Sequence, residues 1–266
     1  MRVFVINLDR CPERMTRLAG LLGALDVPFE RIAAVDGRRL EPIPAAKAFA
    51  GGHAVTRAER ACMLSHRMAW MRLMASADEY GLVLEDDVHL GEDFGAIARG
   101  DIGLEADAFD VIKIETRNHK IWVDRFDAKT VCRGRTIARL HSTHLGAAAY
   151  VISRAGIEKM LPSIEAGGLA LDEMLFGGRG RVPVGFRSYQ MIPALAIQDE
   201  LLRGKPGFVG LASAITPDRL VRPKRMDMRK LAREAARPFR QLAEIVMPLH
   251  LVCKRRRVRR LSVGLE

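Results

Sequence analysis

Arg2-Val3-Phe4-Val5-Ile6-Asn7-Leu8 begins the chain as an apolar run rich in β-branched residues, and polar residues follow it, which is the pattern of a buried strand. Pro12 suits the first turn of a helix, and apolar residues at helical spacing continue to about Leu25. Residues 29–35 have the pattern of a second short strand, which Asp36-Gly37 ends. A strand, a helix and a strand in this order begin a parallel sheet covered by helices, so the sequence predicts an α/β fold.

A capping box marks the start of the next predicted helix. Thr56 and Glu59 stand three residues apart, so the hydroxyl and the carboxylate can each satisfy an unpaired backbone amide. We expect the helix over residues 57–76, with its buried side formed by Leu64, Met68, Met71 and Met74 or Ala75. Later apolar runs predict strands at residues 80–84, 111–114, 145–153 and 190–197 and a short helix at residues 154–161, whereas residues 117–139 are polar without a regular period.

The positive charge of the chain lies near its C-terminus. The 266 residues carry a formal net charge of +11. Residues 219–266 contain 15 Lys/Arg and 4 Asp/Glu, whereas residues 1–218 contain 28 of each and are neutral overall. With 48% hydrophobic residues, the chain can bury a full core. We therefore predict one domain over residues 1–218 and a basic extension over residues 219–266, which is helical in part at residues 228–240.

The cysteines and the apolar runs indicate a cytoplasmic protein. None of Cys11, Cys62, Cys132 and Cys253 is in C-x-x-C spacing, so we expect free thiols in a reducing compartment. The apolar run that ends at Ile6 is shorter than a signal peptide requires. The sequence also has no run of about 18 apolar residues that would span a membrane.

Glu85-Asp86-Asp87 follows the predicted strand at residues 80–84, at the end of a strand where α/β sheets bind their ligands. Carboxylate oxygens suit Mg²⁺ or Mn²⁺, which take part of their coordination shell from substrate phosphates. Such an ion neutralises a leaving diphosphate. The triplet therefore predicts a divalent metal site, and a solvated turn that carries three acids is the alternative interpretation.

Five short segments occur together in the order known from one protein family. They are residues 5–10 with 12–14, residues 34–37, the E-x-x-C-x-x-S-H pattern of Glu59, Cys62, Ser65 and His66, residues 83–88, and residues 146–153 followed by Asp172-Glu173. Over residues 2 to about 198, the chain thereby resembles glycosyltransferase family 25, the lipooligosaccharide galactosyltransferase group of bacteria. Arg60-Ala61 departs from the family, which more often has a small or apolar residue and glycine at this place.

The resemblance implies a GT-A-like fold, which is a Rossmann-type sandwich with a mostly parallel central sheet. It also implies transfer of a hexose, most often galactose or glucose, from a UDP-sugar donor with inversion at the anomeric carbon. The acceptor that it implies is a lipooligosaccharide or other surface glycan, presented as a lipid-linked saccharide. A metal-dependent nucleotide-sugar hydrolase, and a catalytically degenerate protein that binds membrane or nucleic acid, are the alternative functions.

The chemistry of an inverting transfer assigns roles to the carboxylates. Asp86 and Asp87 are the predicted ligands of Mn²⁺ or Mg²⁺, with Glu85 assisting or orienting them. An acceptor hydroxyl is a poor nucleophile, so a carboxylate must take its proton. We predict Asp172 as this base, with Glu173 as the alternate. The alternative role of Asp172 is to cap the helical segment that follows it.

The predicted donor site draws on the ends of the first two strands, the capped helix and the acidic triplet. Asp36 suits a hydrogen bond to the ribose or base, and Gly37 permits close approach. Arg10 or Arg14 can meet the diphosphate. A solvated Arg14 and a His66 that is only a satisfied buried histidine are the alternatives. The residues of the predicted donor site are Asn7, Arg10, Arg14, Asp36, Gly37, Ser65, His66, Glu85 and Asp86.

The basic extension suits an anionic membrane surface. Residues 228–240 place arginines on one side of a helix and apolar residues on the other. A surface anchor fits a lipid-linked acceptor, so we expect a peripheral protein on the inner face of the cytoplasmic membrane. A disordered solvated tail is the alternative. Nucleic-acid binding is disfavoured, because Phe239 is the single aromatic residue of the extension and no recognition motif is present.

Overall fold

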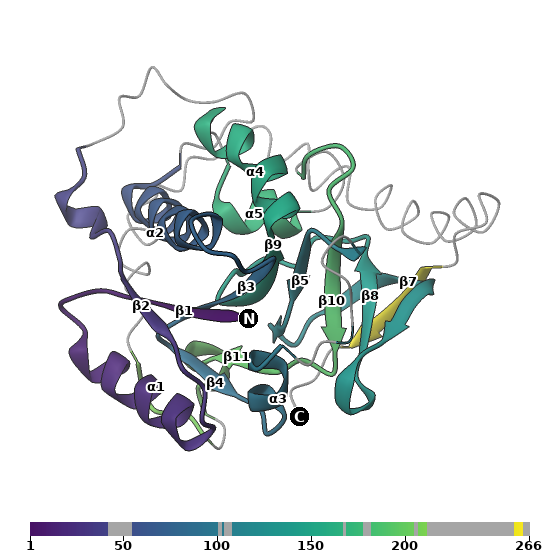
Figure 1. Ribbon diagram of the computed structural model, residues 1–266, viewed down its shortest axis with the longest axis horizontal. Coiled ribbons are helices and arrows are strands. Elements are labelled where there is room, and N and C mark those ends of the chain that lie inside the picture. Colours follow the sequence, from purple (N-terminus) through teal and green to yellow (C-terminus); the bar gives the residue numbers. More distant parts are fainter. Residues whose placement is uncertain are drawn as a thin grey trace.

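The structure is a computed structural model that describes residues 1–41, 55–100, 103, 108–166, 169–177, 182–204, 207–211 and 258–262. A large sheet lies between two layers of helices (Figure 1). Helices α1 (Pro12–Ala24) and α3 (Phe94–Ala98) pack on one face. Helices α2 (Arg57–Met74), α4 (Arg154–Ala166) and α5 (Leu171–Phe176) pack on the other. These layers confirm the predicted α/β class.

The described residues form one large and one small sheet. The large sheet has nine strands in the order β12-β7-β8-β10-β5-β9-β3-β1-β2, and the small sheet has the order β4-β11-β6. The strands are β1 (Arg2–Asn7), β2 (Glu30–Ala33), β3 (Tyr80–Glu85), β4 (Val88–Leu90), β5 (Val111–Lys113), β6 (Glu115–Thr116), β7 (Lys120–Thr130), β8 (Thr136–Leu140), β9 (Ala149–Ser153), β10 (Ser188–Ile192), β11 (Ala196–Gln198) and β12 (Val258–Ser262). Short 3₁₀ helices are η1 (Gly37–Arg39), η4 (Cys132–Gly134) and η5 (Asp199–Leu202).

The large sheet is mixed, so the expectation of a mostly parallel sheet is wrong. Strand β1 pairs in parallel with β2 and β3, and β5 pairs in parallel with β10. The other pairs are antiparallel, because β9 inserts between β3 and β5 in the opposite direction and the β7–β8 pair extends the sheet beyond β10. Strands β7 and β8 come from the polar segment at residues 117–139, where the sequence pattern indicated no strand.

The first strands determine where the site lies. Side chains alternate along β1, so Val3 and Val5 join the core under α1, while Phe4 and Ile6 join the core under α2. At its end, β1 pairs with β2 on one side and with Glu85 of β3 on the other. The carboxyl ends of three parallel strands therefore meet at one edge of the sheet.

Helix α2 begins with the predicted capping box. Thr56 Oγ1 accepts a hydrogen bond from Glu59 N at 3.1 Å, and Glu59 Oε2 accepts one from Thr56 N at 2.8 Å. The predicted buried side is wrong, because Met68 and Met71 are 44% and 43% exposed. The residues that are buried instead are Ala61, Met63, Ser65, His66, Ala69, Trp70 and Leu73. Several of them are small, which lets the helix approach the sheet closely.

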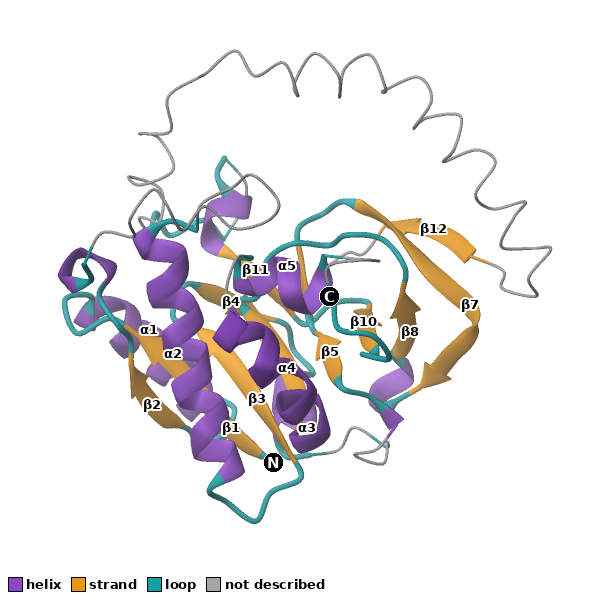
Figure 2. Ribbon diagram, turned by 90° about the horizontal axis from the view of Figure 1, so that it is seen from above, coloured by secondary structure: helices purple, strands orange, loops and turns teal. Residues whose placement is uncertain are grey.

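The basic extension is described only at β12, and the predicted helix at residues 228–240 lies outside the described residues. Strand β12 pairs antiparallel with β7 at the edge of the large sheet, with Val258 opposite Asp124 and Ser262 opposite Lys120 (Figure 2). Within the described ranges, no helix has the length and apolar character needed to cross a membrane.

Candidate active site

A cavity of about 620 Å³ opens where the carboxyl ends of β1, β2 and β3 meet. This volume suits a small-molecule ligand. Its walls come from the β1–α1 connection, from η1, from the first turns of α2 and from the segment after β3. The predicted site residues that line it are Arg10, Arg14, Asp36, Gly37, Ser65, His66, Glu85, Asp86 and Asp87. Those that do not are Asn7, Asp172 and Glu173.

Asp86 is held on both carboxylate oxygens by protein donors. Arg14 Nη1 donates to Asp86 Oδ1 at 2.6 Å, and Asn7 Nδ2 donates to Asp86 Oδ2 at 2.7 Å. Burial raises the pKa of Asp86, and the positive charge of Arg14 opposes that rise. Arg14 is 5% exposed, so it is a buried partner of the acids and not a solvated helix residue. Asn7, at the end of β1, holds Asp86 in place without lining the cavity itself.

Asp87 is the member of the triplet with an oxygen left over. Its side chain is buried, and Oδ1 has no hydrogen-bond partner among the described residues. Oδ2 lies 3.7 Å from Arg14 Nη2. Burial, followed by the charge of Glu85, raises the pKa of Asp87 to about 7. A buried carboxylate oxygen without a partner is unfavourable, and a divalent cation bound there would supply the partner. The residues present therefore fit a Mg²⁺ or Mn²⁺ ion.

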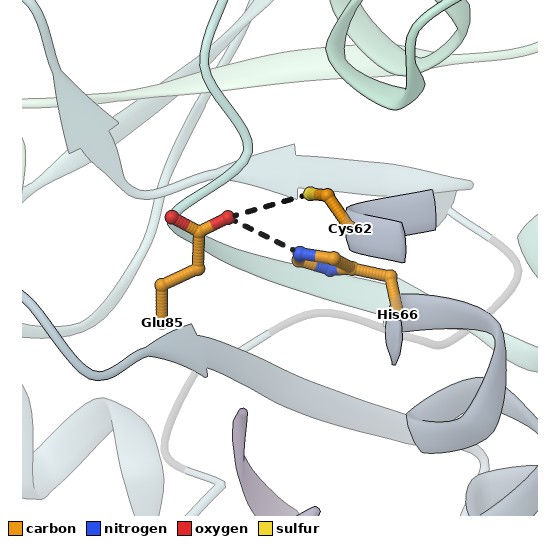
Figure 3. Close-up of side chains that lie close together, drawn as sticks. All are labelled: Cys62, His66 and Glu85. Atoms are coloured by element: carbon orange, nitrogen blue, oxygen red, sulfur yellow. Dashed lines mark hydrogen bonds and ion pairs between the residues drawn. The ribbon is translucent and has the colours of Figure 1, made fainter. Parts of the chain in front are cut away.

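Glu85 faces helix α2 across the cavity. His66 Nε2 lies 3.3 Å from Glu85 Oε1, and Cys62 Sγ lies 3.8 Å from the same oxygen (Figure 3). Gln198 Nε2 donates to Glu85 Oε2 at 3.4 Å. Burial acts to raise the pKa of Glu85, but the hydrogen bond and charge of His66, the charge of Arg14 and the hydrogen bond from Cys62 together lower it.

A buried chain of hydrogen bonds fixes the ring of His66. His66 Nδ1 lies 2.8 Å from the Tyr150 hydroxyl, and Trp70 Nε1 donates to that hydroxyl at 2.8 Å. The ring of His66 also stacks on that of Tyr150, with centroids 5.7 Å apart. His66 is thus a buried histidine with its hydrogen bonds made, which is the alternative stated for it from the sequence. Its Nε2 still reaches Glu85 of the acidic triplet.

The connection after β2 is tied to helix α2 and to two arginines. Asp36 accepts hydrogen bonds from the backbone and guanidinium of Arg38, and from Arg10 Nε at 3.3 Å. The hydrogen bond from the Arg38 side chain is the main cause that holds the pKa of Asp36 far below its usual value. A side chain at Gly37 would lie 3.0 Å from Arg57 O, so glycine here permits close approach to the helix backbone. Ser65 Oγ accepts from Val35 N at 2.9 Å and so joins the two elements.

Asp172 lies in the first turn of α5 and does not line the cavity. The N-cap of this helix is Ala170, so the alternative role of Asp172 as a cap is wrong. Asp172 Oδ2 accepts from Gly146 N at 3.0 Å, which orients the carboxylate. Burial, followed by the charges of Glu85 and Asp172, raises the pKa of Cys62. Glu173 is in the same turn of α5 and is partly buried.

A buried ion pair supports the turn that holds Asp172. Lys113 Nζ lies 2.6 Å from Glu115 Oε1, both side chains are fully buried, and the same oxygen accepts from Ala148 N at 2.9 Å. Lys113 also donates to the carbonyl of Gly146. Gly146 has a φ of 97°, and a Cβ there would meet Glu115 Oε1 at 2.9 Å, so only glycine suits this position.

Sequence reasoning missed three contributors to the site. Cys62 was noted only as part of a motif, yet it lines the cavity and contacts Glu85. Gln198 bonds to Glu85, and its own Oε1 accepts from Arg117 Nη1 at 3.2 Å. A polar residue directly after an apolar strand was the signal that identified the triplet, and the same signal could have found Gln198. The Lys113–Glu115 pair could have been noticed as opposite charges separated by one residue in an apolar run.

Comparison with known proteins points in one direction. The sequence model of glycosyltransferase family 25 (LPS biosynthesis protein) matches residues 1–175. The lacto-N-neotetraose biosynthesis glycosyltransferase LgtE of Neisseria meningitidis is 30% identical over 217 residues, which cover 75% of this chain and 74% of that protein. The lipooligosaccharide biosynthesis protein lex-1 of Haemophilus influenzae is 29% identical over 181 residues, or 64% of this chain and 58% of that one.

A shorter match is to a mouse protein. The inactive glycosyltransferase 25 family member 3 is 32% identical over 102 residues, which cover 35% of this chain and 17% of that protein.

Proposed function

This chain belongs to glycosyltransferase family 25, and from that premise we propose that it transfers a hexose, galactose or glucose, from a UDP-sugar to a lipooligosaccharide or other surface-glycan acceptor. The names of the bacterial relatives, which refer to lacto-N-neotetraose and lipooligosaccharide biosynthesis, support this class of acceptor. The cavity at the strand ends supports a nucleotide-sugar donor, because its volume of about 620 Å³ and its arginines suit a diphosphate. The domain that we assign to this activity comprises residues 1–218, in a GT-A-like arrangement.

One observation carries the proposal of metal dependence. Asp87 is buried at the donor cavity with an oxygen that has no partner among the described residues. Asp87 is therefore the residue that would hold Mn²⁺ or Mg²⁺, with Asp86 and Glu85 beside it. The ion, when bound, supplies positive charge to the diphosphate that leaves. Arg14 is committed to Asp86 and Asp87, so its role is to hold the acids in place.

The arginines at the cavity divide the work of binding the donor. The side chain of Arg10 is 37% exposed and pairs with Asp36 only at 3.3 Å, so it can turn toward a diphosphate. Arg57 lines the same cavity and can add a bidentate contact, whereas the guanidinium of Arg38 is already paired with Asp36. We propose Arg10 as the diphosphate contact in preference to Arg14. Asp36, Gly37, Ser65 and His66 shape the wall against which the nucleotide lies.

The transfer itself is a single displacement with inversion. The acceptor oxygen attacks the anomeric carbon, the bond from that carbon to the diphosphate oxygen breaks, and the electron pair leaves with UDP. Asp172 takes the proton of the acceptor hydroxyl, with Glu173 as the alternate base. The hydrogen bond from Gly146 N orients Asp172 for this task, and the Lys113–Glu115 pair holds that turn in place.

The basic extension at residues 219–266 is proposed to hold the enzyme at an anionic membrane surface. The charge balance of +11 in this part of the chain supports the proposal, since each basic residue near such a surface contributes about 1 kcal/mol. The location that follows is the inner face of the cytoplasmic membrane, where a lipid-linked saccharide is accessible.

The experiment that tests the function is a transfer assay on the full chain. The assay contains UDP-galactose or UDP-glucose, Mn²⁺ and truncated lipooligosaccharide as acceptor. The mass of the glycan is measured by mass spectrometry, and the released UDP is quantified. We expect a glycan heavier by one hexose, with UDP released only when the acceptor is present. UDP released equally without acceptor would assign a nucleotide-sugar hydrolase. No UDP release under either condition would favour a degenerate binding protein.

A further inference from the structure

We propose that Cys62, His66 and Glu85 form a binding site for a thiophilic divalent cation, and that the ion is Zn²⁺. The three side chains converge on one point in Figure 3, two from helix α2 and one from the end of β3. Their ligand atoms all lie within 4.8 Å of one another. The site differs in chemistry from the oxygen of Asp87 that suits Mg²⁺ or Mn²⁺, because it offers sulfur and nitrogen as well as oxygen.

The distances from His66 Nε2 and from Cys62 Sγ to Glu85 Oε1 are close to the edges of a tetrahedron around zinc. Bond lengths of about 2.05 Å to nitrogen, 2.1 Å to oxygen and 2.3 Å to sulfur give edges of about 3.4 Å from nitrogen to oxygen and about 3.6 Å from sulfur to oxygen. His66 Nε2 lies 3.3 Å from Glu85 Oε1, and Cys62 Sγ lies 3.8 Å from it. These two edges need shifts of only a few tenths of an ångström to receive the ion, and Cys62 Sγ lies within 4.8 Å of a ring nitrogen of His66.

Secondary structure places the ligands before any ion arrives. Cys62 and His66 are four residues apart on α2, so their side chains lie on the same face of the helix. The capping box of Thr56 and Glu59 fixes the start of this helix, and Glu59 is three residues before Cys62. Glu85 ends β3, which is hydrogen-bonded on both sides by β1 and β9. A rigid site of this kind loses little entropy when it binds an ion.

The charges balance when zinc is bound. A thiolate from Cys62, a carboxylate from Glu85 and the neutral imidazole of His66 offer two negative charges to Zn²⁺ in a largely buried place, so the complex has no net charge. Because the thiolate is the form that binds metal, binding of the thiol releases its proton to solvent as the zinc–sulfur bond forms.

The surroundings complete the pattern of a zinc site with an open position. The Tyr150 hydroxyl, 2.8 Å from His66 Nδ1, can accept the proton of that nitrogen when Nε2 binds metal. Gln198 holds the second oxygen of Glu85 at 3.4 Å. All three ligands line the donor cavity, so the fourth position of the ion faces the open volume. Three protein ligands and one open position are the arrangement of zinc sites that contact small molecules.

Cobalt substitution of the full chain tests the site without any assay of transfer. The metal-free protein is titrated with Co²⁺, and the absorption from sulfur-to-cobalt charge transfer is recorded. The bound Co²⁺ is then displaced with Zn²⁺. We expect one thiolate-bound Co²⁺ per chain, with the charge-transfer band present in the wild type and in Cys11→Ser, and absent in Cys62→Ser. Cys11 is the matched control, because it is a partly buried free cysteine that also lines the cavity.

The affinity for Zn²⁺, measured by competition with a chromophoric chelator, gives the second result. Loss of a residue that only hydrogen-bonds to a metal ligand already lowers metal affinity about 10- to 100-fold, so loss of the thiolate should weaken binding at least about 100-fold in Cys62→Ser. A wild type without the charge-transfer band would overturn the proposal, as would a band that persists in Cys62→Ser. Neither readout uses the sugar donor or the acceptor. Failure of the zinc-site proposal is therefore distinguishable from failure of the proposed transferase function.

Discussion

At the scale of single residues, the three adjacent acids of the triplet have three different environments. Asp86 is occupied by Arg14 and Asn7, Asp87 keeps an oxygen without a partner in the described structure, and Glu85 contacts His66 across the cavity. The sequence predicted a metal site from the three together. It could not separate their roles, because the partners come from residues up to 79 positions away.

Asp172→Asn tests the assignment of the general base. The asparagine keeps the size and the hydrogen bond from Gly146 N, but it cannot take a proton. We expect kcat for hexose transfer to fall by about 10²- to 10⁴-fold, the usual contribution of such a base, while the Kd for UDP changes by less than about twofold. Steady-state kinetics and calorimetry give the two values.

Glu173→Gln is the matched control, since Glu173 is the next residue of the same helical turn. It should retain most of the activity. If Glu173→Gln loses transfer and Asp172→Asn does not, the base is Glu173. If Asp172→Asn instead loses UDP binding, Asp172 has a structural or donor-binding role.

The buried ring of His144 should lower the free energy of unfolding in acid. Its ring is buried, Nδ1 lies 2.8 Å from Gln190 Oε1, and Lys113, His119 and Arg117 are the charged or titratable neighbours that oppose protonation. Burial, followed by the charge of Lys113, lowers the pKa of His144 to about 3. The unfolded chain therefore binds a proton below about pH 6.5 when the folded chain does not, and the stability present above that pH is lost as the pH falls toward 3.

Between pH 7 and pH 5, this residue should lower the free energy of unfolding by about 2 kcal/mol. His144→Asn removes the titration and places an amide where Nδ1 was, so its stability should fall about 2 kcal/mol less over the same interval. Urea unfolding of both proteins at the two pH values measures the difference. An equal loss in both would show that His144 does not stay neutral in the folded state.

At the scale of elements, the packing of α4 can be tested where Gly156 lies against the backbone of Asp110, the residue before β5. A Cβ at Gly156 would lie 2.3 Å from Asp110 O, which is backbone and cannot move aside easily. Gly156→Ala should therefore destabilise the fold by about 3 kcal/mol or more, near the upper end of overpacking effects. The midpoint of urea unfolding measures it.

Gly20→Ala is the matched control for Gly156→Ala, because Gly20 is also a helical glycine and has no atom within 4 Å of an added Cβ. Alanine in an exposed helix should stabilise it by about 0.5–1 kcal/mol. Opposite signs for the two substitutions support the described packing of α4. A neutral Gly156→Ala would contradict it.

The elements that the sequence predicted correctly have local causes. The opening strand, helix and strand, and the capping box of α2, depend on residues within a few positions of one another. The antiparallel insertion of β9 and the division of the predicted strand at residues 190–197 into β10 and β11 depend on distant neighbours. The exposed methionines of α2 had the same cause, since the choice between two apolar faces was made by contacts with the sheet.

At the scale of the whole molecule, the positive charge of residues 219–266 predicts binding to anionic membranes, which can be measured. Full-length protein should co-sediment with vesicles that contain anionic lipid, bind neutral vesicles much less, and dissociate as salt rises from 0.1 M to about 1 M, because screening shortens the reach of the charges. Replacing Lys254, Arg255, Arg256 and Arg257 by glutamine should weaken binding by up to about 1 kcal/mol for each residue. Equal binding to neutral and anionic vesicles would contradict a role of the basic extension at membranes.

A divalent cation at Asp87 is proposed to help this cavity to bind a UDP-sugar. The most direct test is calorimetric titration of the full chain with UDP, with and without Mn²⁺, beside Asp87→Asn and the surface control Asp9→Asn, whose side chain is 76% exposed. We predict that Mn²⁺ tightens UDP binding at least about tenfold, or about 1.4 kcal/mol, in the wild type and in Asp9→Asn. Asp87→Asn should lose this gain. UDP binding that is the same with and without Mn²⁺, or a gain that survives in Asp87→Asn, would contradict the account.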